Sequence, residues 1–280
     1  MKQVLACIDG SAASVPVCDY AAWASTRLAA PLVFLHVIDQ PPVVHHNLSG
    51  TLGANSRQVL MDELVALDER RTRLAREHGE YLLDAAKHHV DNQGVVHPIG
   101  RQRHGNLIDS ILDAEADTGL IVLGRSDIHS SQYRVGRQVE SVTRAVDCSV
   151  MVASSPFTIP QRFVLAYDGS ETAQRCVEKV AVSTLLKGLD CHLLMVGGQT
   201  TSSRAQMSQA QRRLEQEGYA VTAAIHGGEF EAVIANYCRA EQIDLLVMGA
   251  FGSSRLHRFF VGSTTTTMLH KAPVPLLLLR

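Results

Sequence analysis

The sequence predicts an α/β protein of two tandem domains, each a doubly wound, five-stranded parallel sheet flanked by helices. Three observations lead to this prediction. Strand-like and helical segments alternate along the chain, the strands are continuous apolar runs typical of a sheet covered on both faces, and the second half of the chain repeats the first.

The repeat is visible in long matching segments. LACIDGS (5–11) recurs as VLAYDGS (164–170), and NLIDSILDAEADTGLIVLG (106–124) matches EAVIANYCRAEQIDLLVMG (231–249). The offset between copies falls from 159 to 125, so the second copy lacks a segment that follows the second strand of the first. We therefore expect domains at residues 1–155 and 160–280, joined by the serine- and proline-containing segment 154–161.

Each copy follows the same order of elements. A buried strand (3–9 and 162–168) ends in an Asp-Gly-Ser turn and leads into a helix, expected at 13–29 and 172–188. A second strand, a helix and a short third strand follow, the last expected at 95–100 and 220–226. A helix, a fourth strand, a glycine-containing loop, a helix and a final strand complete the copy, the final strands being 147–154 and 272–279.

The extra segment of the first copy predicts a loop at 40–56 and a long amphipathic helix at 57–90. Leucines recur at helical spacing among charged residues, at Leu60, Leu64, Leu67, Leu74 and Leu82. This pattern is typical of a helix with a solvated face.

Composition indicates a globular protein and narrows its partners. Of the 280 residues, 46% are hydrophobic and 19% are charged, and the net charge of -2 argues against a nucleic-acid-binding protein. We expect no membrane partner, because no apolar run reaches membrane-spanning length. The six scattered cysteines form no C-x-x-C pair, so we expect reduced, buried thiols and a cytoplasmic protein.

The segment after the fourth strand of the second copy is the candidate binding site, because such sheets bind ligands at the carboxyl ends of their strands. Gly249 and Gly252 can turn backbone amides toward a ligand, and Gly262-Ser263-Thr264 starts a helix whose N-terminus favours an anion. Ser253 and Arg255 add polar and positive groups between them. The residues alone leave two interpretations open, a phosphate cradle and an ordinary strand-to-helix loop.

The spacing G-x-x-G, nine residues, G-[ST] resembles the nucleotide motif of the universal stress protein family. The Asp-Gly-Ser turns and LHVID (35–39) extend the resemblance over nearly the whole chain, and they imply a tandem, Rossmann-like member. In the family's ATP-binding members the Asp after the first strand contacts the nucleoside, the end of the second strand holds the adenine and the glycine loop holds the phosphates.

Carried to this sequence, the resemblance implies ATP with Mg²⁺ as the ligand. It assigns Asp168 to the nucleoside, Val196 to the adenine, and Gly249, Gly252, Ser253, Arg255, Gly262, Ser263 and Thr264 to the phosphates, with Ala166 as a further cofactor-binding residue. Asp168 can also be a turn-forming residue without a ligand. The resemblance further implies that the two final strands pair, so that one chain is an internal pseudo-dimer; a homodimer of whole chains stays open.

The first copy departs from the motif. Asp127 stands where the second glycine belongs, Gly136 follows too early, and Arg137 replaces the serine or threonine. A carboxylate repels phosphate, so we expect one nucleotide site per chain, in the second copy.

No catalytic or metal-ligating residue is assigned. The sequence has no G-x-S-x-G and no H-E-x-x-H motif, and the adjacent His88 and His89 point to different helix faces. The resulting expectation is a stress-response or signalling module with ATP as a regulatory ligand. The alternatives are a structural or partner-binding stress protein without nucleotide, and a slow ATPase in which His257 is the titratable candidate.

Overall fold

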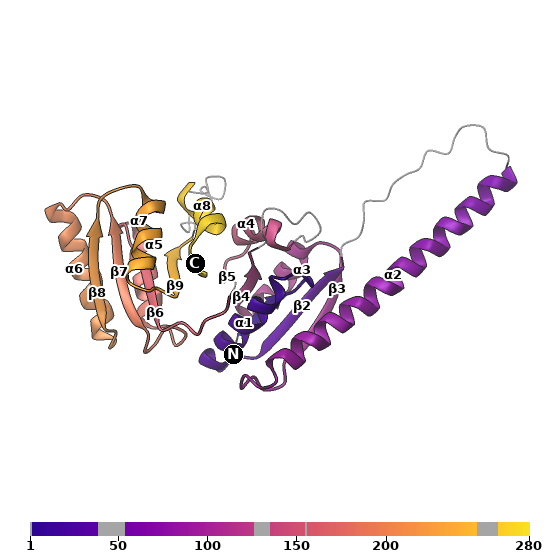
Figure 1. Ribbon diagram of the computed structural model, residues 1–280, viewed down its shortest axis with the longest axis horizontal. Coiled ribbons are helices and arrows are strands. Elements are labelled where there is room, and N and C mark those ends of the chain that lie inside the picture. Colours follow the sequence, from indigo (N-terminus) through magenta and orange to yellow (C-terminus); the bar gives the residue numbers. More distant parts are fainter. Residues whose placement is uncertain (1, 39–53, 126–134, 155, 251–262) are drawn as a thin grey trace.

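A computed structural model of the chain describes residues 2–38, 54–125, 135–154, 156–250 and 263–280, without the side chains of 54–60, 135–137 and 263–264. Figure 1 shows two αβ halves side by side with one long helix projecting from the first. The first half contains β1 (Gln3–Cys7), α1 (Ser14–Leu28), β2 (Leu32–Ile38), α2 (Ala54–Val90), β3 (Ile99–His104), α3 (Leu107–Ala114), the short 3-10 helix η1 (Glu115–Asp117), β4 (Thr118–Gly124), α4 (Val135–Ala145) and β5 (Ser149–Ala153).

The second half repeats this order. It contains β6 (Arg162–Ala166), α5 (Glu171–Ala181), β7 (Asp190–Val196), α6 (Thr201–Gln216), β8 (Val221–His226), α7 (Phe230–Ala240), β9 (Leu245–Gly249), α8 (Ser263–Lys271) and β10 (Leu276–Leu279). The predicted alternation of strands and helices, and the long helix of the first copy, are confirmed.

All ten strands form one sheet in the order β3-β2-β1-β4-β5-β10-β9-β6-β7-β8. Within each half the strands are parallel, but β5 and β10 pair antiparallel, with Leu277 opposite Met151. The expected pairing of the two final strands is thus confirmed, and the halves are related as in a dimer. Because the direction of the strands reverses at this pair, the carboxyl ends of the two half-sheets lie on opposite edges of the sheet.

Two apolar cores cover the two faces of the sheet. One core packs α1, the C-terminal end of α2, α5 and α6 against one face, and the other packs α3, α4, α7 and α8 against the opposite face. The strands are buried on both sides, which explains their continuous apolar sequences.

Side chains reinforce the junction of the halves beside the β5–β10 pair. Arg27 Nε of α1 donates to the carbonyl oxygen of Leu185 at 2.6 Å, and the Tyr20 and Phe157 rings meet edge to face with centroids 4.7 Å apart. On the other face, the Thr266 hydroxyl of α8 donates to Glu140 of α4 at 3.4 Å. Both faces of the junction are therefore bridged.

Two predicted boundaries are wrong. The third strand of the first half begins at Ile99 and not at 95, because Pro98 has no N–H to donate and His97 has a positive φ of 52°. The helix expected to reach 188 ends at Ala181, where the hydroxyl of Tyr219 donates to the carbonyl oxygen of Val180 at 2.8 Å. That bond supplies a partner for a carbonyl in the last turn of α5.

Each half has a glycine at the end of its fourth strand that the first helix crowds. A Cβ at Gly124 would lie 2.7 Å from Cβ of Ala13, and a Cβ at Gly249 would lie 2.8 Å from Sγ of Cys176. Real Cβ atoms do not approach so closely, so these two glycines allow α1 and α5 to pack on the sheet.

We predict that Gly124→Ala and Gly249→Ala each lower the free energy of unfolding by about 1–3 kcal/mol, because the added methyl pushes a packed helix off the sheet. Urea denaturation measures the change. Gly198→Ala is the matched control, since its Cβ would meet nothing closer than Thr200 Cγ2 at 4.0 Å. Equal stability of all three variants would contradict this packing role.

Because His192 is buried, we expect the stability of the second half to fall in acid. Nδ1 of His192 lies 2.9 Å from the Tyr237 hydroxyl, and burial lowers the pKa of His192 below its ordinary value of 6.5. The unfolded chain therefore takes up a proton that the folded chain resists, and the free energy of unfolding falls as the pH drops below about 6.5.

We predict that replacing His192→Phe together with Tyr237→Phe flattens the dependence of the urea midpoint on pH between about 6.5 and 5, because the titrating group and its partner are both removed. Tyr237→Phe alone keeps the histidine and should keep the slope. An unchanged slope in the double variant would show that His192 does not cause the acid sensitivity.

Candidate functional site

The carboxyl ends of three neighbouring strands form the candidate site. β6 lies between β9 and β7, so the ends of these strands at Ala166, Val196 and Gly249 share one edge of the sheet. β7, the next strand along the chain, lies on one side of β6, and β9 lies on its other side. The strand order reverses here, which makes this edge a topological switch point. The structure thus brings together the strand-end residues that the sequence analysis selected.

Asp168 stands in the turn after β6 and is exposed at this edge. Its Oδ1 accepts the backbone N–H of Ser170 at 2.9 Å, and the Ser170 hydroxyl accepts the N–H of Ala173 at 3.2 Å and caps α5. Gly169 adopts a φ of +78° beneath the side chain of Gln206. Asp168 therefore shapes the turn and also presents a carboxylate at this edge of the sheet.

The N-terminus of α8 is the second part of the site. The helix begins at Ser263, has no acidic residue in its first turn, and carries His270 and Lys271 in its last turn. The dipole at its N-terminus is therefore not offset by an acidic side chain of that turn, which favours an anion. Ser263 and Thr264 are its first residues, whereas Gly252, Ser253, Arg255 and Gly262 lie outside the described residues, as does His257.

Glycine doublets after β7 and β8 are a part of this edge that the sequence analysis missed. The Gly197 N–H donates to the carbonyl oxygen of His226 at 2.8 Å, and a Cβ at Gly197 would meet no heavy atom within 4 Å. The surface at Gly197, directly after Val196, is therefore open. The signal was present in the sequence as Gly197-Gly198 and Gly227-Gly228, each directly after a strand.

Gly249 has a packing role that does not depend on a ligand. The same crowding by the first helix occurs at Gly124 in the first half, where the rest of the motif is altered. The first glycine of the motif is therefore explained by helix packing alone, and the other parts of the motif carry the case for phosphate binding.

The first half forms the same turn, but the residue that follows its fourth strand has a different role. Asp9 Oδ1 accepts the Ser11 N–H at 3.0 Å, as Asp168 does for Ser170. Arg125, directly after Gly124, reaches across the junction and donates from Nη1 to the carbonyl oxygen of Ala272 at 2.5 Å. Its counterpart in the second half, Ala250, is a buried alanine.

The altered part of the first-half motif is described only at its end. Asp127 lies outside the described residues. The helix α4 begins at Val135, so Gly136 and Arg137 lie within its first turn, whereas Gly262 precedes α8. The N-terminus of α4 is therefore displaced along the motif relative to that of α8.

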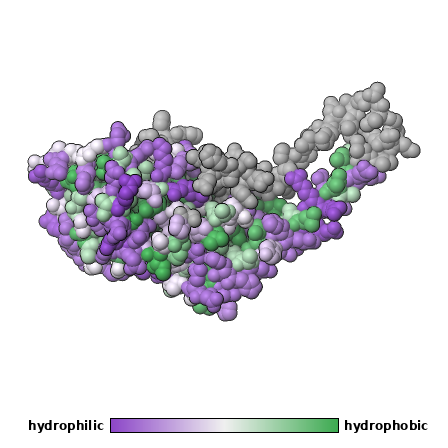
Figure 2. Space-filling view, viewed as in Figure 1, coloured by the Kyte–Doolittle hydropathy of each residue, from purple (hydrophilic) through white to green (hydrophobic). Residues whose placement is uncertain are grey.

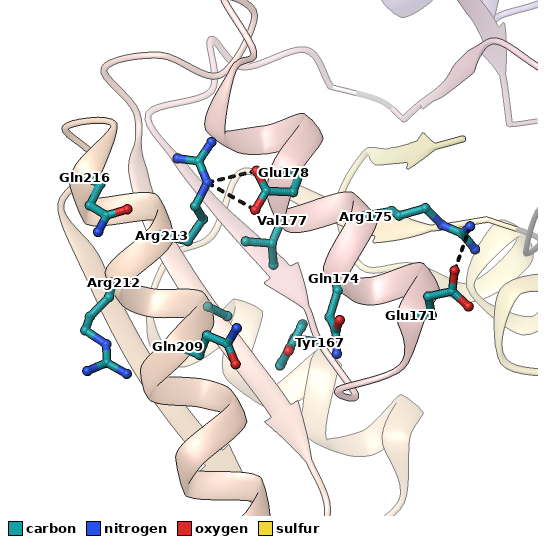
Figure 3. A pocket seen from close by; sticks show the side chains of 11 residues that line it. Tyr167, Glu171, Gln174, Arg175, Val177, Glu178, Gln209, Arg212, Arg213 and Gln216 are labelled. Carbon is teal, nitrogen blue, oxygen red and sulfur yellow. Dashed lines mark hydrogen bonds and ion pairs between the residues drawn. The ribbon is translucent and has the colours of Figure 1, made fainter.

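A groove of 680 Å³ runs between α5 and α6, next to the turn that holds Asp168 (Figure 3). Two of the three arginines that line it are held by carboxylates: Arg213 Nε contacts both oxygens of Glu178 at 2.8 and 3.1 Å, and Arg175 pairs with Glu171 at 3.2 Å. None of the predicted site residues lines the groove, and its ion pairs join α5 to α6 or lie within α5. We therefore assign the groove to helix packing and not to the nucleotide.

Nucleophilic or metal chemistry outside this edge would need reactive thiols or clustered ligands among the described residues. Burial raises the pKa of all six cysteine thiols, for example that of Cys176 to about 11, which keeps them protonated at neutral pH. Among the described residues, no group of three or more His, Cys, Asp or Glu side chains is arranged to hold a metal ion. The helices in the same part of the chain include none long and apolar enough to cross a membrane.

Comparison with known proteins agrees with this architecture. The profile described as Universal stress protein family matches residues 1–154 and 196–280. Universal stress protein Slr1230 of Synechocystis sp. is 31% identical over 287 residues and matches all of both chains.

Solved structures show the same two-part fold. A universal stress protein from Archaeoglobus fulgidus superposes with a TM-score of 0.69 over all of this chain and 96% of its own, at 18% identity. The functionally unknown protein PA1789 from Pseudomonas aeruginosa covers all of this chain and 92% of its own with a TM-score of 0.62, at 13% identity. With the family profile on both halves and a relative that matches end to end, the chain belongs to the universal stress protein family.

Proposed function

We propose that this protein binds ATP with Mg²⁺ at the carboxyl edge of β6, β7 and β9 and uses the nucleotide as a regulatory ligand in a stress response. The observation that carries the proposal is the convergence of the Asp168 turn, the end of β7 at Val196 and the strand that enters the motif at Gly249. The domain that binds is the second, residues 160–280.

The chemistry of this edge suits each part of the nucleotide. The Asp168 carboxylate can accept the ribose hydroxyls, and the open backbone beside Val196 can receive an adenine edge. The α8 N-terminus and the other glycines of the motif, Gly252 and Gly262, favour phosphate, and Mg²⁺ accompanies the phosphates because it binds largely through their oxygens and water.

A structural or partner-binding role without nucleotide is the second candidate function. It is favoured by the hydrogen bond from Ser170 N–H to Asp168 and by the packing at Gly249, because both recur in the first half at Asp9 and Gly124. Under this alternative the turn and the glycine serve the fold in both halves. A slow ATPase remains a third possibility, tested by turnover with His257→Ala.

We predict that Gly252→Asp, which copies the first-half sequence, weakens ATP affinity at least about tenfold, because a carboxylate placed near phosphate repels it. Isothermal titration calorimetry with Mg·ATP measures the affinity. Asp127→Ala, at the matching position of the first half, is the control and should leave the affinity unchanged. No measurable binding by the wild-type chain would favour the partner-binding alternative, and equal affinity of Gly252→Asp would refute the site.

We predict that Asp168→Asn lowers ATP affinity about tenfold, because a charged acceptor of ribose hydroxyls is replaced by a neutral one worth roughly 1.4 kcal/mol less. Asparagine keeps an oxygen to accept the Ser170 N–H, so the turn should persist. Asp9→Asn is the matched control in the same turn of the first half. A similar loss in both variants would indicate a general effect on folding.

A further inference from the structure

The N-terminal part of α2 extends away from the body of the protein (Figure 1). From residue 61 to 78 its side chains are exposed, except for the half-buried Leu64 and Ala75. Gly79 is buried, and a Cβ there would clash with Gln102 and His36. The helix therefore reaches the sheet between Arg76, whose carbonyl oxygen accepts from Gln102 Nε2 at 3.1 Å, and Gly79, and its preceding turns have an open surface.

An apolar seam runs along this exposed part. Leu67, Leu74 and Tyr81 follow one another at intervals of seven residues, and Leu64 precedes Leu67 by three, which is the a/d spacing of a coiled coil. The a positions that follow Leu64 hold Arg71 and His78. The side chains of Leu67, Leu74 and Tyr81 are 62%, 53% and 70% exposed. Figure 2 shows hydrophobic residues among hydrophilic ones along the projecting arm.

The seam lies on a different face of α2 from the residues that pack against the sheet. Gly79, Leu83, Ala86 and Val90 are the residues buried against the sheet. Each residue advances about 100° around a helix, so the line through Leu67, Leu74 and Tyr81 lies about 150° from that buried face. A partner helix can reach the seam without displacing the sheet.

We propose that the part of this seam within the projecting helix, here called the α2 seam (Leu64, Leu67 and Leu74), pairs with the α2 seam of a second copy of the chain. The two helices form an antiparallel coiled coil whose twofold axis crosses α2 between Val65 and Ala66. Leu64 of each copy then packs against Leu67 of the other.

Charge favours this orientation. Glu63 and Arg70 are both exposed and flank the seam at the same heptad position, so the twofold places Glu63 of each copy opposite Arg70 of the other. A parallel pair in register would instead set Glu63 opposite Asp68 and would place Arg71 against Arg71 on the seam. Of these two arrangements, only the antiparallel one places opposite charges against each other.

The length of the free helix fits the same axis. A twofold between residues 65 and 66 places residue 54, the first of α2, opposite residue 77 of the other copy. The overlap therefore ends just before Gly79, where each helix meets its own sheet. It spans about 36 Å, or a little over three heptads, and leaves the two bodies at opposite ends of the pair.

Sedimentation equilibrium of the full-length chain tests the pairing. The wild type should be a dimer at micromolar concentration, and Leu67→Glu should be a monomer, because the twofold buries two carboxylates at the centre of the seam. The far-UV circular dichroism spectrum of Leu67→Glu should match that of the wild type, apart from the signal of the projecting part of α2, which no longer has a partner helix. A monomeric wild type, or a dimer that persists in Leu67→Glu, would overturn the proposal.

Charge exchange tests the orientation. Glu63→Arg or Arg70→Glu should raise the dimer Kd about tenfold, because two attractive pairs become repulsive, and the combined exchange Glu63→Arg with Arg70→Glu should restore it. Glu69→Arg makes the same change of charge on the opposite side of the helix and should leave the Kd unchanged. Tighter association of Glu63→Arg would indicate a parallel pair and would overturn the antiparallel arrangement.

Discussion

The antiparallel pairing of β5 with β10 is the interaction on which the rest of the structure depends. Val150, Met151 and Val152 pair with Leu278, Leu277 and Leu276, and all six are buried. Each half-sheet would otherwise end in an apolar, unpaired edge strand, which is prone to uncontrolled association. The pairing removes both edges, places equivalent helices on the same face, and puts the carboxyl ends of the two half-sheets on opposite edges.

The two halves share one fold but differ in the residues that follow the fourth strand. The Asp-Gly-Ser turns and the strand-end glycines have the same structural roles in both halves. Arg125, by contrast, lies in the altered motif of the first half and bonds across the junction to Ala272, where the second half has the buried Ala250. The first half thus contributes this position to the junction, whereas the second half does not.

The candidate site was predictable from the sequence to the extent that strand ends can be located. Ala166, Val196 and Gly249 were placed correctly at one edge, because buried parallel strands have recognisable apolar sequences that end in polar turns. The open surface of Gly197 was not foreseen, since it depends on how β7 and β8 leave the sheet. The assignments of nucleotide contacts to residues 249–264 stay predictions.

The sequence by itself determined the two-copy α/β fold, the order of its elements and, through family resemblance, the pairing of the final strands, because apolar periodicity and repetition can be read along the chain. Only the tertiary structure decided where α5 ends, how Arg125 is used and how far α2 projects. Tyr219 meets Val180, Arg125 meets Ala272, and Gly79 meets the sheet through contacts between residues far apart in sequence. No local pattern encodes such contacts, because their energies exist only once the chain has folded.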